Sequence, residues 1–581
     1  MGLAQIPVSK AISDRIKSTL IAPEHIRKVS DGHYFIDFGK DAFGTLVLTF
    51  KSREKDSVII HLGEKLTRPS VIDKEPGGTI RYQKIKLTDI PLQKEYVIKL
   101  AVDKRNTGPK AIALPESVGV ITPFRYCEIE NLDVPIDDVI IRQKVYNYEF
   151  NDNSSFFTSS DTVLNKVWDM CKHTVKATSF AGLYIDGDRE RIPYEADAYI
   201  NQLSHYAVDN EYSIARNTNE FFIKHPTWPT EWILHMVPLF YYDFQYTGNK
   251  DLITKYYDDL RRRTLMEIAR EDGLISVKSP LMTKEVLSGI NRKQNLRDIV
   301  DWPTGERDHY DMVDVNTVVN SFHYWNLRLM AQIAGHLGKK ADSIDFLNRS
   351  LLVKKTINDK LLDPATGLYV DGENSKHSSL HANMFPLAFG LVSESNRKTI
   401  IEFVKCKGMA CSVYGAQYLL EGLYQQGQGD YALSLMTSKS KRSWWNMIST
   451  GSTMALEAWD MKYKPNSDWN HAWGTAPANI ITRYMWGITP GSPGFKIVKI
   501  KPQLGQLKFS KIKVPTANGP IMANYKLVDE NHALYTIELP RKVTGVFDVG
   551  ENVKVFLNDR SMESTKPIFL NQGLNTIHVK W

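Results

Sequence analysis

The residue pattern of the 581-residue chain changes its period twice. Up to about residue 155, short β-branched and aromatic runs alternate with polar residues between Gly, Pro, Asp and Asn, which predicts an antiparallel β-sandwich. From about 156 to 490, apolar residues recur at the spacing of amphipathic helices. From 491 to 581 the alternation returns and predicts a second β-sandwich. We therefore expect three domains, 1–155, 156–490 and 491–581.

The central segment contains about a dozen helical stretches and no repeated short motif, which disfavours a solenoid. So many helices in one domain indicate a closed double ring, an (α/α)6 barrel, in which the loops of the inner helices converge on one pocket. The order sandwich, barrel, sandwich is frequent among carbohydrate-active enzymes, but fold alone does not decide function. Besides one that begins after Asp161, the stretches are 195–223, 231–247, 251–271, 315–337, 340–360, 379–391, 397–406, 415–426, 430–438 and 471–486.

Composition excludes several classes of protein. The 73 basic residues against 66 acidic ones give a net charge of +7 that is spread along the chain. The densest basic run, Arg261–Arg263, falls on a predicted helix and indicates a solvated face, so we expect no nucleic-acid partner. No apolar run approaches the roughly 18 to 20 residues of a membrane helix, so we expect no membrane insertion. The four cysteines form no C-x-x-C pair, which disfavours a zinc site or a disulfide framework.

The compartment and the oligomeric state stay open at this point. Met1–Gln5 lacks the basic and apolar regions of a signal peptide. A periplasmic or secreted protein is expected if a signal has been removed, and a cytoplasmic protein otherwise.

The densest charged segment, Ile185–Asp197, holds five carboxylates and two guanidinium groups. Gly187 and Pro193 predict a loop, and the apolar stretches on both sides place that loop near a core. Carboxylates crowded near a core raise one another's pKa, which produces an acid that is still protonated near neutral pH. A surface ion-pair cluster is the alternative, but the flanking sequence favours a catalytic role.

Two further groups place acids beside aromatic residues. Glu457 lies in an apolar setting, where an unpaired carboxylate needs a partner or a function, and His471 and Trp473 follow at the start of the last predicted helix. Trp232 and the pair Asp301–Trp302 stand before other predicted helices. Helix capping, a salt bridge or core packing would explain each group separately. Their recurrence favours a sugar site, because a ring stacks on the apolar face of a sugar and carboxylates accept hydrogen bonds from its hydroxyls.

Over most of its length the chain resembles the α-L-rhamnosidases of glycoside hydrolase family 78. The similar segments are Phe35–Gly39, Ala42–Gly44 and Gly78–Tyr82 for the N-terminal sandwich, Asp186–Asp197 for the acidic signature loop, Pro229–Trp232 and Asp301–Trp302 for the sugar pocket, Leu456–Trp459 for the general base and Asn470–Trp473 for the last helix. The combination is specific, although any single segment is weak.

The resemblance implies an inverting hydrolase that removes terminal α-L-rhamnose and needs no metal or other cofactor. It implies Glu190 as the general acid and Glu457 as the base that activates water. An apolar wall that contacts the C5 methyl group of the sugar would favour rhamnose by about 1–3 kcal/mol. The residues expected to bind or orient the sugar are Asp186, Arg189, Tyr194, Asp197, Trp232, Asp301, Trp302, His471 and Trp473.

Two features depart from the family pattern. Relatives commonly have Gly-Trp after the Arg-Glu-Arg run, where this chain has Ile192-Pro-Tyr194, and a tyrosine offers a smaller stacking face. The spacing from Asp186 to Glu190 is shorter than in some members, so the roles of Asp186 and Asp188 stay open.

Three other functions remain as alternatives. The same fold could hydrolyse another sugar, and a non-catalytic glycan-binding protein could use its acids only as hydroxyl acceptors. A polysaccharide lyase would need a Tyr, His or Lys base beside a basic cluster, which the acidic loops disfavour. The natural glycan, its linkage and its aglycone stay open.

Overall fold

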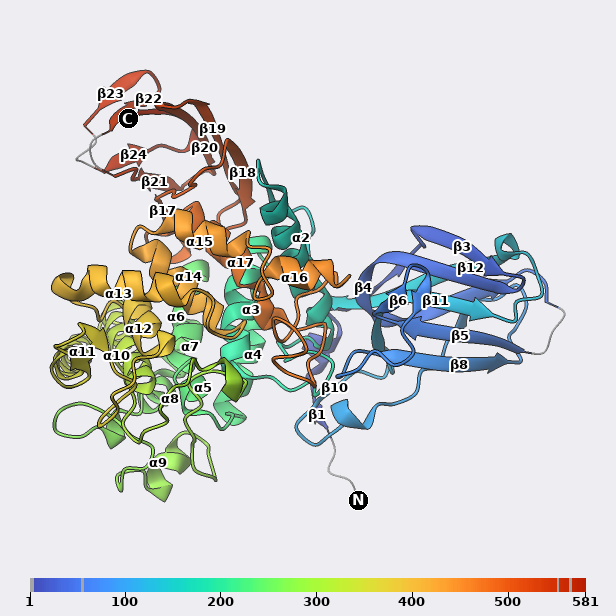
Figure 1. Ribbon diagram of the computed structural model, residues 1–581, viewed down its shortest axis with the longest axis horizontal. Coiled ribbons are helices and arrows are strands. Elements are labelled where there is room, and N and C mark those ends of the chain that lie inside the picture. Colours follow the sequence, from blue (N-terminus) through green and yellow to red (C-terminus); the bar gives the residue numbers. More distant parts are fainter. Residues whose placement is uncertain (1–4, 54–56, 551–552, 564–566) are drawn as a thin grey trace. The chain divides into compact units, whose positions relative to one another are not determined.

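The computed structural model describes residues 5–53, 57–550, 553–563 and 567–581 (Figure 1). These residues form two structural units. The first comprises the described residues up to Phe150 with Asp169–Pro193 and Lys439–Thr475, and the second comprises Asn151–Trp168, Tyr194–Ser438 and Ala476–Trp581. Segments far apart in the sequence therefore share a unit.

An antiparallel sheet dominates the first unit. Its strand order is β2-β12-β4-β11-β5-β8, and β3 and β9 also pair with β4. Because successive side chains of a strand point to opposite faces, Ile36 and Phe38 lie in the main core while Phe35 joins a smaller apolar cluster on the other face. The strands are β2 Ile16–Ile21, β3 His25–Ser30, β4 His33–Phe50, β5 Ser57–Gly63, β8 Tyr82–Thr88, β9 Tyr96–Val97, β11 Thr122–Glu130 and β12 Val139–Tyr148.

Strand β4 is continuous through Gly39, where a run of short strands would suggest a break. Its pairing with β11 shifts register in this region, and Gly39 itself has a φ of 83°. A β-bulge explains both observations, because it inserts extra residues into one strand and often places glycine in a left-handed conformation. A bulge and a turn use the same residue types, so the sequence alone does not separate them.

Helices make up most of the second unit. The longest are α10 and α11, which pack against each other as a helical hairpin. The helices are α3 Glu195–Val208, α4 Ser213–Lys224, α5 Thr230–Ile233, α6 Met236–Thr247, α7 Asp251–Lys255, α8 Tyr257–Arg263, α9 Lys284–Gly289, α10 Thr317–His336, α11 Lys340–Lys360, α12 Leu380–Phe389, α13 Glu394–Lys407, α14 Gly415–Gln425, α15 Gly429–Met436 and α17 Ala476–Ile480.

These helices differ strongly in how much of their surface is buried. Every residue of α3 and α12 is buried, and α14 buries all but its last residue. Helix α11 buries only five positions on one side, and α13 only three. A helix that is buried all round needs neighbours on every side, whereas a helix with one buried stripe covers a core from outside. This division into inner and outer helices is what a double ring requires.

The predicted helix over 195–223 is two helices, because Glu211 caps a new one. The Glu211 carboxylate accepts hydrogen bonds from the N–H groups of Ser213 and Ile214, both at 3.0 Å. Such bonds satisfy the free N–H groups at a helix start. The prediction over 251–271 also divides, into α7, α8 and a short 3-10 turn at 266–268.

Two sheets at the C-terminal end of the second unit complete the fold. One has the order β13-β18-β19-β20-β25-β22-β23, and the other β16-β17-β21-β24. Strand β13 precedes the helices in the sequence, yet it pairs with β18. The strands are β13 Phe156–Ser159, β16 Thr489–Pro490, β17 Ile497–Ile500, β18 Phe509–Val514, β19 Ile521–Asp529, β20 His532–Leu539, β21 Thr544–Phe547, β22 Lys554–Leu557, β23 Arg560–Met562, β24 Ile568–Leu570 and β25 Gly573–Lys580.

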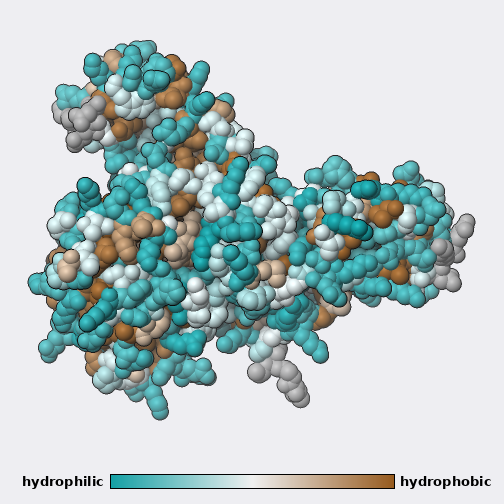
Figure 2. Space-filling view, viewed as in Figure 1, coloured by the Kyte–Doolittle hydropathy of each residue, from teal (hydrophilic) through white to brown (hydrophobic). Residues whose placement is uncertain are grey.

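Hydrophobic residues on the visible face are scattered among hydrophilic ones (Figure 2). Among the described residues, no helix has both the length and the apolar character needed to cross a membrane.

Asp243 on α6 gives the second unit a pH-dependent stability. The side chain is fully buried, accepts a hydrogen bond from the Tyr206 hydroxyl at 3.1 Å and lies 3.5 Å from Arg216 Nε. Burial raises the pKa of Asp243 from 3.8 to about 7, against the opposing charge of Arg216. The folded state therefore binds this proton more tightly than the unfolded state, so the stabilisation is present below the ordinary pKa and is lost as the pH rises to about 7.

We expect the Asp243→Asn variant not to lose unfolding free energy in this way as the pH rises. Between about pH 4 and pH 8 the wild type should lose up to roughly 4 kcal/mol of unfolding free energy relative to the variant. Urea unfolding at several pH values measures the difference. Asp258→Asn, an exposed aspartate on α8, is the control and should follow the wild type. Parallel curves for wild type and Asp243→Asn would contradict the assignment.

Candidate functional site

The acidic loop lies in the first unit, and Gly187 allows it to pack closely against the segment 468–470. Gly187 has a φ of 117°, and a Cβ atom there would lie 2.8 Å from the Asn470 carbonyl oxygen and 2.9 Å from Asp468 Oδ2. Both the backbone conformation and the space exclude a larger residue. Glycine at this position thus brings the two charged segments together.

Asp188 anchors the acidic loop. Its carboxylate is 2% exposed and contacts the Arg81 guanidinium, and Arg191 Nε and Nη2 donate to Asp188 Oδ1 at 2.9 and 2.6 Å. Arg81 Nη2 and Asn106 Nδ2 also donate to the Asp188 carbonyl at 2.7 and 3.0 Å. With two guanidinium groups on one buried carboxylate, Asp188 holds the loop in place, so it is not the group that remains available for chemistry.

Asn470 links this anchor to a second buried acid. Its Oδ1 accepts from the Asp188 N–H at 2.8 Å, and its Nδ2 donates to Glu64 Oε1 at 2.9 Å. Burial raises the pKa of Glu64 to about 7, although Asp41 and Asn470 lower it through hydrogen bonds. The loop is therefore held from both sides by side chains that the sequence does not bring together.

Asp186 differs from Asp188 in its contacts. It is 2% exposed, and its Oδ1 accepts from the Ile192 N–H at 3.0 Å. Its Oδ2 has no hydrogen-bond partner among the described residues and lies 3.8 Å from Arg189 Nη2. Burial raises the pKa of Asp186 well above its ordinary value; Arg189 opposes this effect and Glu190 adds to it. Asp186 is thus a buried acid with one oxygen available to a ligand.

The two predicted catalytic glutamates have different environments. Glu190 is the more accessible, with a side chain that is 39% exposed and an Oε1 atom 4.0 Å from Arg189 Nε. Glu457 is 2% exposed, contacts the Arg189 guanidinium and lies 3.1 Å from Lys464 Nζ. The two cations stabilise the ionised carboxylate of Glu457 electrostatically.

Backbone hydrogen bonds fix Glu457 in an irregular segment after α16 (Trp444–Ser449). The Glu457 N–H donates to the Asp468 carbonyl at 3.3 Å, and Trp473 Nε1 donates to the Glu457 carbonyl at 2.9 Å. His471 packs against the Trp473 ring with centroids 4.8 Å apart, and its Nδ1 lies 3.2 Å from Asp468 Oδ1. The predicted residues Glu457, His471 and Trp473 therefore form one cluster, as their proximity in the sequence suggested.

Asp468 completes this cluster as the partner of His471. Burial alone would raise the pKa of Asp468, but His471, Arg189 and Lys464 together hold that pKa below its ordinary value. Glu457, Asp468 and His471 place one ligand atom each within 4.8 Å of one another, a spacing that a metal ion could use. Arg189 and Lys464 already contact Glu457, so a metal cation there would be the third positive charge at one carboxylate.

The other predicted residues lie in the second unit. Trp232 on α5 is buried, and its ring centroid lies 5.1 Å from that of Tyr414. Tyr194 is half-buried at the start of α3, and the buried Asp197 is in the first turn of that helix. These residues border a core that is rich in aromatic side chains.

Asp301 is fully buried, and protein groups bond both of its carboxylate oxygens. His381 Nε2 lies 2.7 Å from Oδ2, and the Ser412 N–H donates to the same atom at 2.9 Å. The Trp302 N–H donates to Oδ1 at 2.7 Å, and the Ser412 hydroxyl also contacts it. These bonds hold Asp301 in place, and through the bond to its N–H group they also fix the backbone of the half-buried Trp302.

Glu231, beside Trp232, is a positioning residue that we did not expect. Its carboxylate accepts from the Ile299 and Val300 N–H groups, at 2.6 Å for Val300. Burial raises its pKa to about 8. It thereby connects α5 to the backbone that leads into Asp301.

Comparison with known families decides the relationship. A domain described as the bacterial alpha-L-rhamnosidase 6 hairpin glycosidase domain matches residues 152–485, which is more than half of the chain. The chain belongs to the bacterial α-L-rhamnosidase family. The rhamnosidase concanavalin-like domain matches residues 27–146, and the rhamnosidase C-terminal domain matches 487–559.

Individual rhamnosidases are similar at low identity. An alpha-L-rhamnosidase of Formosa agariphila is 20% identical over 99% of this chain and 61% of its own length. The α-L-rhamnosidase structure from Dictyoglumus thermophilum has a TM-score of 0.75 at 17% identity, covering 97% of this chain and 63% of that one. The Streptomyces avermitilis enzyme complexed with L-rhamnose has a TM-score of 0.73 at 14% identity, covering 97% and 54%. The chain spans about three fifths of the length of the first two relatives.

The rhamnosidase relationship confirms the predicted fold class, a helical barrel domain between N-terminal and C-terminal β-domains. The limits at 155 and 490 stay predictions. The six-hairpin match includes Glu190 and Glu457, whereas Arg81 and Glu64 fall within the concanavalin-like match. The N-terminal rhamnosidase domain thus supplies the groups that anchor the acidic loop.

We expect Arg81→Met to destabilise the acidic loop strongly, because it removes a guanidinium group from the buried Asp188 carboxylate. Removing one partner of a buried ion pair leaves the other charge uncompensated, which typically lowers unfolding stability by about 3–5 kcal/mol. Chemical unfolding and activity measured on the same preparation test this. Arg349→Met is the control, because Arg349 pairs with Asp345 at an exposed position and should change stability by about 0–1 kcal/mol. Equal stability of the two variants would show that Arg81 is not an anchor.

Proposed function

We propose that the chain hydrolyses terminal α-L-rhamnosyl bonds of rhamnose-containing glycans or glycosides with inversion of configuration. Membership of the rhamnosidase family supports the reaction class. The observation that carries the proposal is the cluster around Arg189, which contacts Glu457 and lies near both Asp186 and Glu190. Paired carboxyl groups of different environment are what glycoside hydrolysis needs.

In the proposed mechanism Glu190 is the general acid and Glu457 is the general base. Glu190 gives its proton to the departing oxygen as the C1–O bond breaks. Glu457 takes a proton from water as the water oxygen bonds to C1 on the opposite face of the ring. An inverting pair stands about 6.5–9.5 Å apart so that water fits between. The accessible Glu190 suits contact with a leaving group, and the buried Glu457 suits a single activated water.

Asp186 is the proposed hydroxyl-binding acid of the loop. Its raised pKa means that it holds a proton at higher pH than an ordinary aspartate, so it can donate a hydrogen bond as well as accept one. Its Oδ2, which lacks a hydrogen-bond partner among the described residues, is the atom available for a sugar hydroxyl. His471 and Trp473 are proposed to bind the sugar beside Glu457, and Tyr194, Trp232 and Trp302 stay predictions as sugar contacts.

Activity on an aryl α-L-rhamnoside, compared with a panel of other aryl glycosides, tests the proposal. We expect turnover of the rhamnoside and a first-formed product that is β-L-rhamnose by proton NMR. Preference for another sugar would favour the alternative that the Ile192-Pro-Tyr194 departure suggests. An early α-L-rhamnose product would indicate retention and would overturn the assigned role of Glu457.

A further inference from the structure

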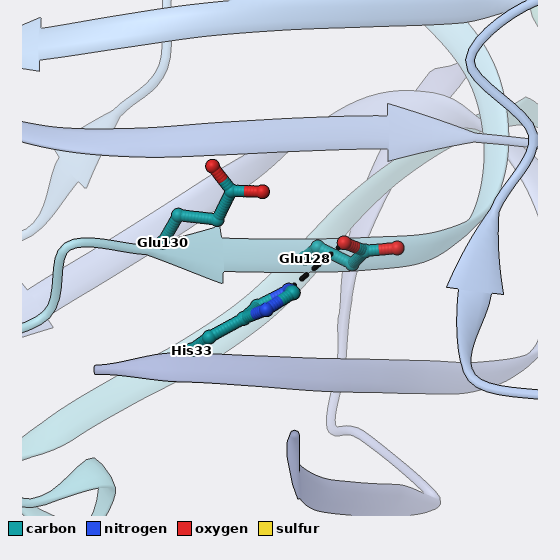
Figure 3. Close-up of side chains that lie close together, drawn as sticks. All are labelled: His33, Glu128 and Glu130. Carbon is teal, nitrogen blue, oxygen red and sulfur yellow. Dashed lines mark hydrogen bonds and ion pairs between the residues drawn. The ribbon is translucent and has the colours of Figure 1, made fainter. Parts of the chain in front are cut away.

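Four polar residues, two of them buried and two partly exposed, lie together on the N-terminal sheet, on the face opposite its main core. His33 is on β4, and Glu128 and Glu130 are on β11 (Figure 3). His61 is on the neighbouring strand β5. Glu128 pairs directly with His61 across the sheet and with Phe35 of β4. Paired residues, and residues two apart on a strand, point to the same face. All four side chains therefore emerge on one side of three neighbouring strands.

The group is close enough to share one ligand. His33 Nε2 lies 2.9 Å from Glu128 Oε2, and His61 Nε2 lies 3.3 Å from Glu130 Oε1. His33, Glu128 and Glu130 place one ligand atom each within 4.8 Å of one another. Tetrahedral bonds of about 2.0–2.2 Å to a metal give ligand separations of about 3.3–3.6 Å. His61 is not part of that group of three and lies near Glu130, so its ring and the ends of the other side chains would have to shift for all four to reach one ion.

His61 gives an independent indication of a ligand. It is 1% exposed, its Nδ1 lies 2.8 Å from the Tyr82 hydroxyl, and its Nε2 makes no hydrogen bond to a described residue. If Nδ1 carries the proton and donates it to Tyr82, the lone pair of Nε2 faces the Glu130 oxygen. In that tautomer Nε2 can bind a cation placed between it and Glu130; in the other tautomer Nε2–H points to Glu130 and Nδ1 accepts from the Tyr82 hydroxyl, so metal binding would select the first.

Glu128 is also buried without any part in the proposed reaction. It is 2% exposed, and its Oε1 accepts from the Ile72 N–H at 2.6 Å, which leaves Oε2 to face His33. Lys74 Nζ lies 3.5 Å from Glu130 Oε1, and because its side chain is about half exposed, this amine can move into water.

We propose that His33, His61, Glu128 and Glu130 form a binding site for a divalent transition-metal ion of the Zn2+ type. Two imidazole nitrogens and two carboxylate oxygens match zinc, whereas Ca2+ and Mg2+ take oxygen ligands. The ion would join β4, β5 and β11 on the face away from their core. This site is distinct from the Glu457 cluster and does not depend on the proposed hydrolysis.

Zinc titration of the full chain, freed of metal with a chelator, tests the proposal by calorimetry and thermal unfolding. We expect one Zn2+ per chain and a higher melting temperature with zinc. Glu130→Gln and His61→Gln should weaken binding at least about tenfold, because each removes a metal ligand, and glutamine keeps the side-chain shape of Glu130. His25→Ala, which removes an exposed histidine of β3, is the matched control and should bind normally.

A second possible metal group among the described residues, Glu457 with Asp468 and His471, is tested in parallel with His471→Ala. Loss of zinc binding in His471→Ala, with normal binding in Glu130→Gln and His61→Gln, would place the metal at the Glu457 cluster and overturn the proposal. The absence of stoichiometric binding would also overturn it. Glu130 is partly exposed, so Glu130→Gln is the variant expected to fold even if His61→Gln does not, and its melting temperature in chelator verifies this.

Discussion

Replacing Glu457 with glutamine is expected to lower kcat on an aryl α-L-rhamnoside by about 10²–10⁴-fold. Glutamine fills the same space and can still accept a hydrogen bond from Arg189, but it cannot take a proton from water. Because the change acts on the transition state, KM should change far less than kcat. Initial rates over a range of substrate concentrations give both constants.

Azide provides the sharper test of Glu457. Azide is a nucleophile that needs no deprotonation, so it should restore turnover in Glu457→Gln and yield a glycosyl azide of inverted configuration. Asp460→Asn is the matched control, since Asp460 lies in the same segment, is partly exposed and has Lys441 Nζ 4.0 Å away. Wild-type turnover in Glu457→Gln, or a failure of azide to increase its rate, would remove Glu457 from the role of base.

The fold could be predicted because burial leaves a periodic trace in the sequence. Helix α12 is largely apolar, as a buried helix should be, whereas α11 leaves four aliphatic side chains exposed, so its sequence alone does not mark it as an outer helix. Helix boundaries were less predictable, because a single side chain decides them. Helix α3 ends at Val208, and Glu211 starts α4 through two hydrogen bonds that no periodicity reveals.

The site could be predicted only where its residues are close in sequence. The charge density of Ile185–Asp197 indicated a site, but it did not separate Asp186 from Asp188. That separation depends on Arg81, which lies 107 residues from Asp188 along the chain. Arg81 and Asn470 both fall within segments that resemble the family. The resemblance therefore included these residues, but the sequence did not show that they anchor the acidic loop through Asp188. Lys464, which reaches Glu457, had no recognisable signal.

Replacing Glu190 with glutamine is expected to have an effect that depends on the leaving group. An acid is needed most when the departing oxygen is strongly basic, as in an alkyl or sugar aglycone, and least when it is a stable phenolate. For a rhamnosyl disaccharide we expect kcat/KM to fall by about 10²–10⁴-fold. For a dinitrophenyl rhamnoside the loss should be much smaller.

The comparison of aryl rhamnosides with leaving groups of graded basicity separates this role from a structural one. A general acid predicts a steeper dependence of log kcat/KM on leaving-group pKa in Glu190→Gln than in the wild type, and a weaker fall in activity at high pH. Misfolding or lost sugar binding would lower kcat/KM for all of these substrates by the same factor. A uniform loss would therefore remove Glu190 as the acid, and Asp186, whose pKa burial raises, would become the residue to replace next.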